Sequence, residues 1–122
     1  MLPDELLAPL PQEEDRAAKN DGEVEVMRQA AADVTEIIAG DRNRYYGCPS
    51  ENHSVTGDMW SAYLSRRLGM KVKISGSDVC WMLILQKASR QAHRPKRDNA
   101  LDVGGYAFNS LACEYAEGIQ DG

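Results

Sequence analysis

The chain lacks the features that mark several protein classes. No apolar run approaches the roughly 20 residues of a membrane-spanning helix, and the N-terminus has no basic stretch followed by an apolar core, as a signal peptide would. The three cysteines are widely spaced and form no Cys-x-x-Cys pair. We therefore expect a cytoplasmic protein whose cysteines serve as small buried apolar residues.

Motifs that would fix a mechanism are also missing. The sequence has no P-loop, no Gly-x-Gly-x-x-Gly, no nucleophile elbow and no zinc-ligand spacing. The net charge of -5 argues against nonspecific binding to duplex DNA, so no direct contact with nucleic acid is expected.

What is present is the composition of one soluble domain, with 122 residues, 43% of them apolar and 27% charged. Residues 1–26 hold eight acids against Arg16 and Lys19, a net charge of -6. Three prolines in residues 1–22 predict an extended acidic arm. Its four leucines favour docking on a neighbouring subunit, and a disordered terminus is the alternative.

Residues 23–119 predict an all-α, four-helix bundle-like domain. The expected helices span about residues 23–39, 51–68, 78–94 and 96–119. Ser50 and Ser77 are the expected N-caps of the second and third. The short alternating segment 71–75 is more typical of a connector than of a sheet.

Apolar spacing also predicts which side chains form the core. Val79–Leu85 is apolar all round and should be the most buried run. Three further stripes are expected to face the core: Met27, Ala30, Ala31, Val34, Ile37 and Ile38; Met59, Trp60, Tyr63 and Leu64; and Leu101, Phe108, Leu111, Ala112 and Tyr115. A domain this small should bury more surface as a homodimer or homotetramer.

Charge is sharply divided in the last third of the chain. Residues 87–97 contain no acid, and residues 98–122 contain no Lys or Arg. If the third and fourth helices pair antiparallel, Lys87 and Arg90 point towards Asp98 and Asp102. This arrangement fits a site for a phosphate and a divalent metal, or equally a structural network of ion pairs.

Other residues are candidates for a site. Asn52 and His53 form the polar end of the second helix's core stripe, and His53 is either a core-edge histidine or a site residue. Tyr45 or Tyr46 would stack on a nucleobase or cover the bundle end. The Gly104-Gly105 pair inside a helix indicates close approach by a neighbouring helix or by a ligand.

The order of several short motifs resembles a phage and prophage domain family of unassigned function. These motifs are Tyr46-Gly47-x-Pro49, Glu51-Asn52-His53, Trp60-Ser-x-Tyr-Leu64, Ser77-Asp78-Val79, Lys87-x-x-Arg90, Asp98 and Asp102-x-x-Gly105-Tyr106. That family in turn looks like a distant member of the MazG-like all-α NTP pyrophosphatases. Those enzymes carry a Glu-Glu-x-x-Glu motif on a helix. The expected core helices of this sequence do not contain it.

The resemblance implies a metal-dependent hydrolase that converts a (d)NTP, such as dGTP, to the monophosphate and pyrophosphate in the host cytoplasm. Asp98, Asp102 and Glu51 would then hold Mg²⁺ or Mn²⁺ and act in catalysis. The substrate would contact Lys87, Arg90, His53, Tyr46 and Asn52. The alternatives are a nucleotide-binding or sequestering protein without turnover, and a phage adaptor whose acidic arm binds a host protein.

Overall fold

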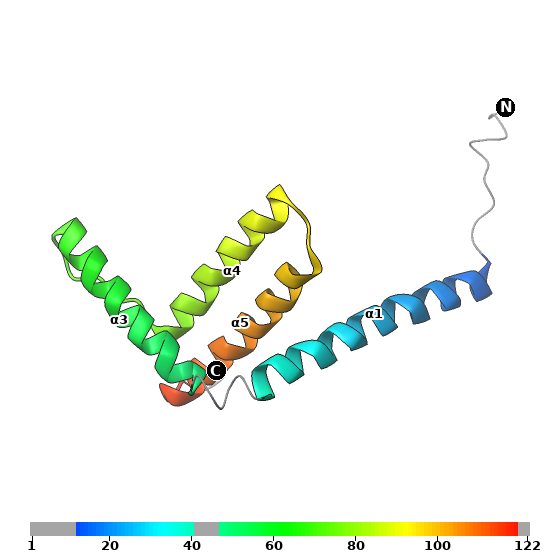
Figure 1. Ribbon diagram of the computed structural model, residues 1–122, viewed down its shortest axis with the longest axis horizontal. Helices are drawn as coiled ribbons and strands as arrows, with labels where there is room; N and C mark the ends of the chain where they lie inside the picture. The colour runs from blue at the N-terminus through cyan, green and yellow to red at the C-terminus, as the bar shows by residue number, and fades with distance from the viewer. Residues whose placement is uncertain (1–11, 41–46, 120–122) are drawn as a thin grey trace. The chain divides into compact units, whose positions relative to one another are not determined.

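The computed structural model describes residues 12–40 and 47–119, and these residues form helices and no strand. The helices are α1 (Glu13–Ala39), α3 (Pro49–Leu68), α4 (Gly76–His93) and α5 (Arg97–Ala116) (Figure 1). The chain divides into two compact units, residues 1–30 and residues 31–122. The predicted all-α class is confirmed. In the described part of the chain, no helix is both long and apolar enough to span a bilayer.

Helix α1 begins at Glu13 and not at the predicted Glu23. Every proline of this region precedes residue 12, and three acids in the first turn (Glu13, Glu14 and Asp15) interact favourably with the helix dipole. Residues 13–22 of the predicted arm are therefore helical, and its residues 1–11 lie outside the described part. Met27, predicted to face the core, is 62% exposed.

The N-cap position of α3 is held by Cys48, not by the predicted Ser50, and its side chain makes no capping hydrogen bond. Pro49 occupies the first turn, where a missing N–H is harmless. The helix ends at Leu68 and is followed by the C-cap residue Gly69, which has a positive φ of 67° and donates its N–H to the carbonyl of Ser65. The chain then turns back along α3.

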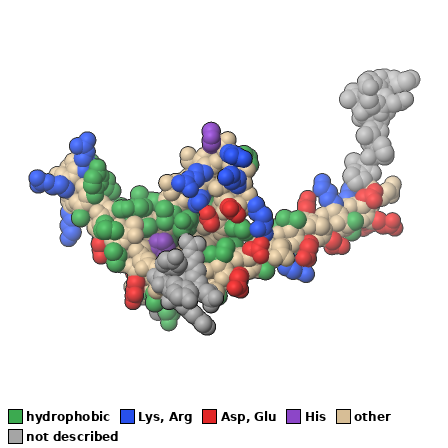
Figure 2. All heavy atoms as spheres, viewed as in Figure 1, with side chains coloured by type: hydrophobic (Ala, Val, Ile, Leu, Met, Phe, Trp, Pro, Cys, Tyr) green, Lys and Arg blue, Asp and Glu red, His purple; other side chains and the backbone are tan. Residues whose placement is uncertain are grey.

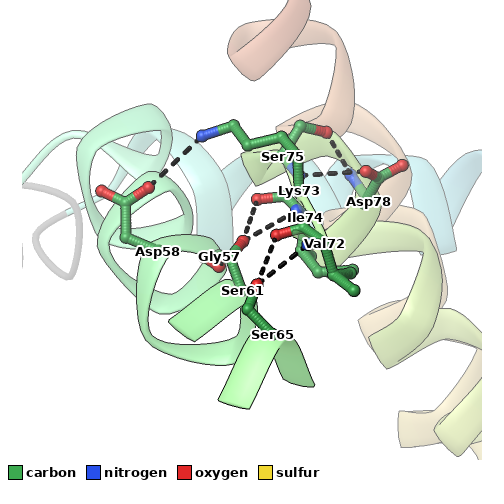
Figure 3. A network of polar contacts seen from close by, with 9 residues as sticks. All are labelled: Gly57, Asp58, Ser61, Ser65, Val72, Lys73, Ile74, Ser75 and Asp78. Carbon is green, nitrogen blue, oxygen red and sulfur yellow. Dashed lines mark hydrogen bonds and ion pairs between the residues drawn. The ribbon is translucent and has the colours of Figure 1, made fainter. Parts of the chain in front are cut away.

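The returning segment, residues 70–75, is held against α3 by two serine hydroxyls (Figure 3). Ser65 Oγ accepts the N–H of Val72 at 2.9 Å, and Ser61 Oγ accepts the N–H of Ile74 at 2.8 Å. Gly57 allows this approach, because a Cβ at that position would lie 2.7 Å from the Ile74 carbonyl oxygen. The segment is a connector, as predicted, and the backbone groups of Val72 and Ile74 bond to serine side chains in place of a neighbouring strand.

Helix α4 begins with a capping box, and its N-cap lies two residues before the predicted one. Ser75, not Ser77, is the N-cap: its hydroxyl accepts the N–H of Asp78, and the Asp78 carboxylate accepts the N–H of Ser75. Ser77 is instead 8% exposed and donates to Glu114 on α5 at 3.1 Å. Ser77 thus ties the start of α4 to α5.

Helices α4 and α5 lie side by side and run antiparallel, as predicted (Figure 1). Their turn is fixed by Gln91, whose side-chain oxygen accepts from the backbone N–H of Lys96 and from the amide of Asn99. Asn99 is only 7% exposed, and its hydrogen bond to Gln91 replaces those that its side-chain amide would make to water. Helix α5 starts at Arg97 and ends at Ala116, inside the predicted bounds of 96–119.

Among residues 31–40 and 47–119, the buried apolar core is small and consists of Val34, Val79, Cys80, Leu101 and Cys113. Burial raises the pKa of the Cys80 thiol to about 12, with neighbouring Cys113 contributing, and burial also raises the pKa of Cys113. Two cysteines thus behave as the predicted small apolar residues, whereas Cys48 is exposed.

All four core predictions, the run and the three stripes, are wrong in part, because one helix face cannot bury every apolar residue. In the run Val79–Leu85, Val79 and Cys80 are fully buried but Trp81, Met82 and Leu85 are exposed. Further exposed residues from the predicted core stripes are Ile37, Met59, Tyr63, Phe108, Leu111 and Tyr115.

Candidate functional site

A cavity of about 610 Å³ opens within residues 31–119. Its wall is formed by the end of α1, the residues leading into α3, and one side each of α3, α4 and α5. The apolar part of the wall includes Ile37, Trp60, Val79, Leu83 and Leu101. The polar side chains converge from α3 and α5: Asn52, His53, Thr56, Asp102, Tyr106 and Asn109. An apolar cavity with a few convergent polar groups is the usual form of a small-molecule site.

His53 stands in the wall between two residues of α5. Its ring meets the Tyr106 ring edge-on, with centroids 6.4 Å apart. The Asn109 amide nitrogen lies 3.4 Å from His53 Nε2, a hydrogen bond if the imidazole proton is on Nδ1. Burial lowers the pKa of His53, so the ring is neutral at pH 7. His53 thus presents a neutral, oriented imidazole to the cavity.

Lys87 and Asp102 form an ion pair across the α4–α5 contact. The two charged atoms, Lys87 Nζ and Asp102 Oδ2, are 2.7 Å apart. The Lys87 side chain is 14% exposed and that of Asp102 is 40% exposed, so the lysine is enclosed while the carboxylate reaches the cavity. The predicted convergence of these two residues is therefore present, and it takes the form of an ion pair.

The other predicted charged residues are not brought to this cavity. Arg90 and Asp98 are exposed, and neither is among the described residues that line it. Figure 2 shows Lys and Arg side chains gathered over the end of α4 and at the far end of α3. Glu51 is exposed and lines a smaller cavity of about 340 Å³, together with Cys113 and Glu117. Tyr46 lies outside the described residues.

The residues expected to hold Mg²⁺ or Mn²⁺ are not gathered around one point in the described part of the chain. Of Asp98, Asp102 and Glu51, only Asp102 lines the main cavity, and Lys87 already balances its charge. Within residues 12–40 and 47–119, no three His, Cys, Asp or Glu side chains are grouped as metal ligands. Mg²⁺ is usually held by one or two carboxylates plus substrate phosphates, so Asp102 alone supplies at most part of such a site.

The two adjacent glycines of α5 differ in their surroundings. A Cβ on Gly104 would lie 3.3 Å from a methyl group of Val34, so the lack of a side chain at Gly104 allows α1 to pack closely against α5 at this point. A Cβ on Gly105 would meet nothing within 4 Å, and Gly105 lines the cavity. Of the two explanations that the sequence left open, close approach by a neighbouring helix applies to Gly104, whereas Gly105 faces open space.

Sequence reasoning missed several residues of the wall. Asn109 was given no role, although it lies on the same face of α5 as Asp102 and Gly105. Tyr106, Thr56 and Trp60 were likewise not assigned to a site. Asn109 was visible from its spacing of seven residues from Asp102, whereas the position of Tyr106 beside His53 depends on how α3 crosses α5.

Comparison with known proteins assigns the chain to a family. Residues 25–114 match the model of a family described as a domain of unknown function (DUF6378), and the chain belongs to that family. It is 37% identical to the Gene 55 protein of Mycobacterium phage L5 over 73 residues, which is 59% of this chain and 44% of the relative. It is 34% identical to the Gene 55 protein of Mycobacterium phage D29 over 76 residues, 62% of this chain and 46% of the relative. The matches thus span less than half of either relative. No solved structure is significantly similar to the chain.

Proposed function

We propose that the cavity binds the nucleoside part of a nucleotide. The observation that carries the proposal is Gly105. A glycine within a helix costs about 1 kcal/mol relative to alanine, and here no protein atom lies close enough to require one. Room for the ligand beside the α5 backbone accounts for that cost.

The size and chemistry of the cavity support a nucleoside as the ligand. Its volume of about 610 Å³ lies within the roughly 300–1,000 Å³ of small-molecule sites. Trp60 and Tyr106 offer aromatic surface for a base. The amides of Asn52 and Asn109 and the neutral imidazole of His53 offer donors and acceptors suited to a base edge.

The phosphates of such a ligand would extend towards α4. Lys87 lies behind Asp102, and exposed Arg90 follows one turn later on the same helix. Their positive charge would offset that of the phosphates. The described cavity wall itself contains no Lys or Arg, which fits the nucleoside part better than the triphosphate.

Hydrolysis of the bound (d)NTP to the monophosphate and pyrophosphate is the second candidate function. It is favoured by the carboxylate of Asp102 at the cavity and by the resemblance to MazG-like enzymes. A divalent ion would supply polarisation of a phosphoryl oxygen and orientation of a water molecule. Asp102 would be one ligand of the ion. The other carboxylate ligands would come from residues that do not line this cavity in a single chain.

Thermal-shift measurements with nucleosides, NTPs and dNTPs, each with and without Mn²⁺, test the proposal. We expect wild type to be stabilised by at least one nucleotide. Gly105→Ala should melt at the same or a higher temperature without ligand, but should lose about 1–3 kcal/mol of binding free energy, because its methyl group occupies ligand space. Gly22→Ala, also open in its surroundings but outside the cavity, is the matched control and should bind as wild type does. No shift with any nucleotide, or equal binding by Gly105→Ala, would contradict the proposal.

A further inference from the structure

Asp102 differs from the other residues of the main cavity in carrying a charge. With His53 neutral, it is the one charged side chain among the described residues that line the cavity. Its Oδ2 atom pairs with Lys87 Nζ at 2.7 Å, and no hydrogen bond joins its Oδ1 atom to any residue that the structure describes. A carboxylate accepts hydrogen bonds and donates none, so Oδ1 is available to a donor group of a ligand.

The groups of a nucleotide differ in how well they suit this carboxylate. A phosphate is negatively charged, so without a metal ion between them a phosphate and Asp102 repel each other. The suitable groups are O–H and N–H donors, which a nucleotide carries on its sugar and on the edge of its base. A hydrogen bond to an ionised acceptor is roughly twice as strong as one between neutral groups. Asp102 therefore contributes most where it faces such donors.

The order of residues along α5 separates the two kinds of donor. Asp102, Gly105 and Asn109 share one face of the helix, and Asn109 lies roughly 10 Å further along the helix axis than Asp102. At the Asn109 end, the side chains of His53 and Tyr106 are in contact with each other. These are the groups suited to a base, so the base is expected at that end of the cavity.

The cations of α4 lie towards the other end. Lys87 pairs with Asp102, and Arg90 stands one helical turn further towards the α4–α5 turn. A nucleotide whose base contacts Asn109 and whose phosphates extend towards Arg90 has its sugar between them, beside Gly105 and Asp102. Its sugar hydroxyls are then the donors within reach of the carboxylate.

We propose that Asp102 binds the sugar hydroxyls of the ligand and selects ribonucleotides over 2′-deoxyribonucleotides; this inference rests on the proposed function of the cavity. The 2′- and 3′-hydroxyls of ribose are two donors side by side, and the lone pairs of a carboxylate can accept both. Deoxyribose retains only the 3′-hydroxyl, so it forms one hydrogen bond fewer. Lys87 offsets the charge of Asp102 and leaves Oδ1 to the ligand.

Titration calorimetry in EDTA tests the proposal, because chelation removes any contribution of Asp102 as a metal ligand. The ligands are ribonucleoside monophosphates of the common bases and their 2′-deoxy counterparts. We expect wild type to bind the ribo form of its preferred base roughly 10- to 100-fold more tightly than the deoxy form, the range for one hydrogen bond to a charged group. In Asp102→Asn this ratio should fall by about tenfold, because the acceptor is then neutral. Lys87→Met/Asp102→Asn should show the same reduced ratio, which separates the effect from any loss of stability.

Asp98→Asn is the matched control. Asp98 is exposed, lies one turn before Asp102 on α5 and is not among the described residues of the cavity wall. Its replacement removes the same charge and should keep the wild-type ratio. Equal affinity of wild type for the two sugar forms, a wild-type ratio in Asp102→Asn, or a ratio reduced equally in Asp98→Asn would overturn this inference and leave nucleotide binding intact. Binding of no nucleotide at all would overturn the proposed function, and this inference with it.

Discussion

Lys87 and Asp102 face each other across α4 and α5 with their charged atoms 2.7 Å apart, and the lysine is the more enclosed of the two. Removing the carboxylate leaves an ammonium group in a poorly hydrated place. We expect Asp102→Asn to lower the free energy of unfolding by about 1–3 kcal/mol, between the values for exposed and buried pairs. Chemical denaturation without ligand measures this loss.

The double mutant sharpens that prediction. Lys87→Met removes the charge and keeps an apolar stem, so Lys87→Met/Asp102→Asn should recover most of the stability lost in Asp102→Asn.

Mn²⁺ separates the two roles of Asp102. A carboxylate that binds metal predicts stabilisation of wild type by Mn²⁺ and none in Asp102→Asn. No effect of Mn²⁺ on wild type, combined with the loss in Asp102→Asn, assigns the pair to the scaffold and removes metal-dependent hydrolysis.

A second prediction concerns the contact between α3 and the segment that returns along it. Gly57→Ala would place a methyl group 2.7 Å from the Ile74 carbonyl oxygen, a backbone atom that cannot turn aside. We expect a loss of about 1–3 kcal/mol, despite the better helix propensity of alanine. Thermal unfolding would detect it. Gly22→Ala gains the same propensity with no clash and should be neutral or stabilising; a Gly57→Ala variant as stable as wild type would mean that the segment is not held closely.

The hydroxyl of Ser61 gives a third prediction in the same region. It accepts the N–H of Ile74 and donates to the Gly57 carbonyl at 2.6 Å, so Ser61→Ala leaves a partly buried N–H without its partner (Figure 3). The expected loss is about 1–3 kcal/mol. Hydrogen exchange at Ile74 should accelerate in Ser61→Ala and not in Ser89→Ala, whose serine is exposed on α4. Unchanged protection at Ile74 would show that another group holds the segment.

The local features of this fold were predictable from the sequence, because they depend on spacing along one helix. Helix periodicity and a short turn suffice to predict an antiparallel α4–α5 pair and the approach of Lys87 to Asp102. The capping box was also predictable, since Asp78 stands three residues after Ser75, yet Ser77 is an equally good N-cap by residue type. Residue type alone does not separate two such serines.

The core and the cavity depend on information that spacing does not contain. Periodicity identifies Phe108 and Leu111 as apolar positions, but it does not determine whether other residues of the same chain bury them. The meeting of His53 with Tyr106 is set by the crossing of two helices far apart in sequence. Glu51 and Asp102, two residues that the predicted metal site required to be close, line different cavities.

The thiols provide a fourth prediction. Cys48 is exposed, whereas Cys80 and Cys113 are buried with pKa values raised by that burial. Because the thiolate is the reactive form, native protein at pH 8 should be alkylated rapidly at Cys48 only, and at all three cysteines after denaturation. Mass spectrometry of the labelled peptides distinguishes these states. Fast native labelling of Cys80 would indicate that α4 and α5 open readily.

The last prediction concerns pH. Burial lowers the pKa of His53 below its ordinary value of 6.5, so the unfolded chain binds this proton more readily than the folded chain does. The contribution of His53 to stability is therefore fully present above pH 6.5 and is lost as pH falls from 6.5 towards the lower folded pKa. His53→Gln should flatten this part of the stability profile.

His93, exposed at the end of α4, is the matched control, and His93→Gln should keep the wild-type profile. Melting temperatures across this range, compared among the three proteins, measure the difference. A wild-type profile retained in His53→Gln would show that other groups cause the pH dependence. Should a nucleotide bind as proposed, protonation of His53 should also weaken its binding, because a charged imidazole can no longer accept the N–H of Asn109 and so hold the two side chains in place in the cavity wall.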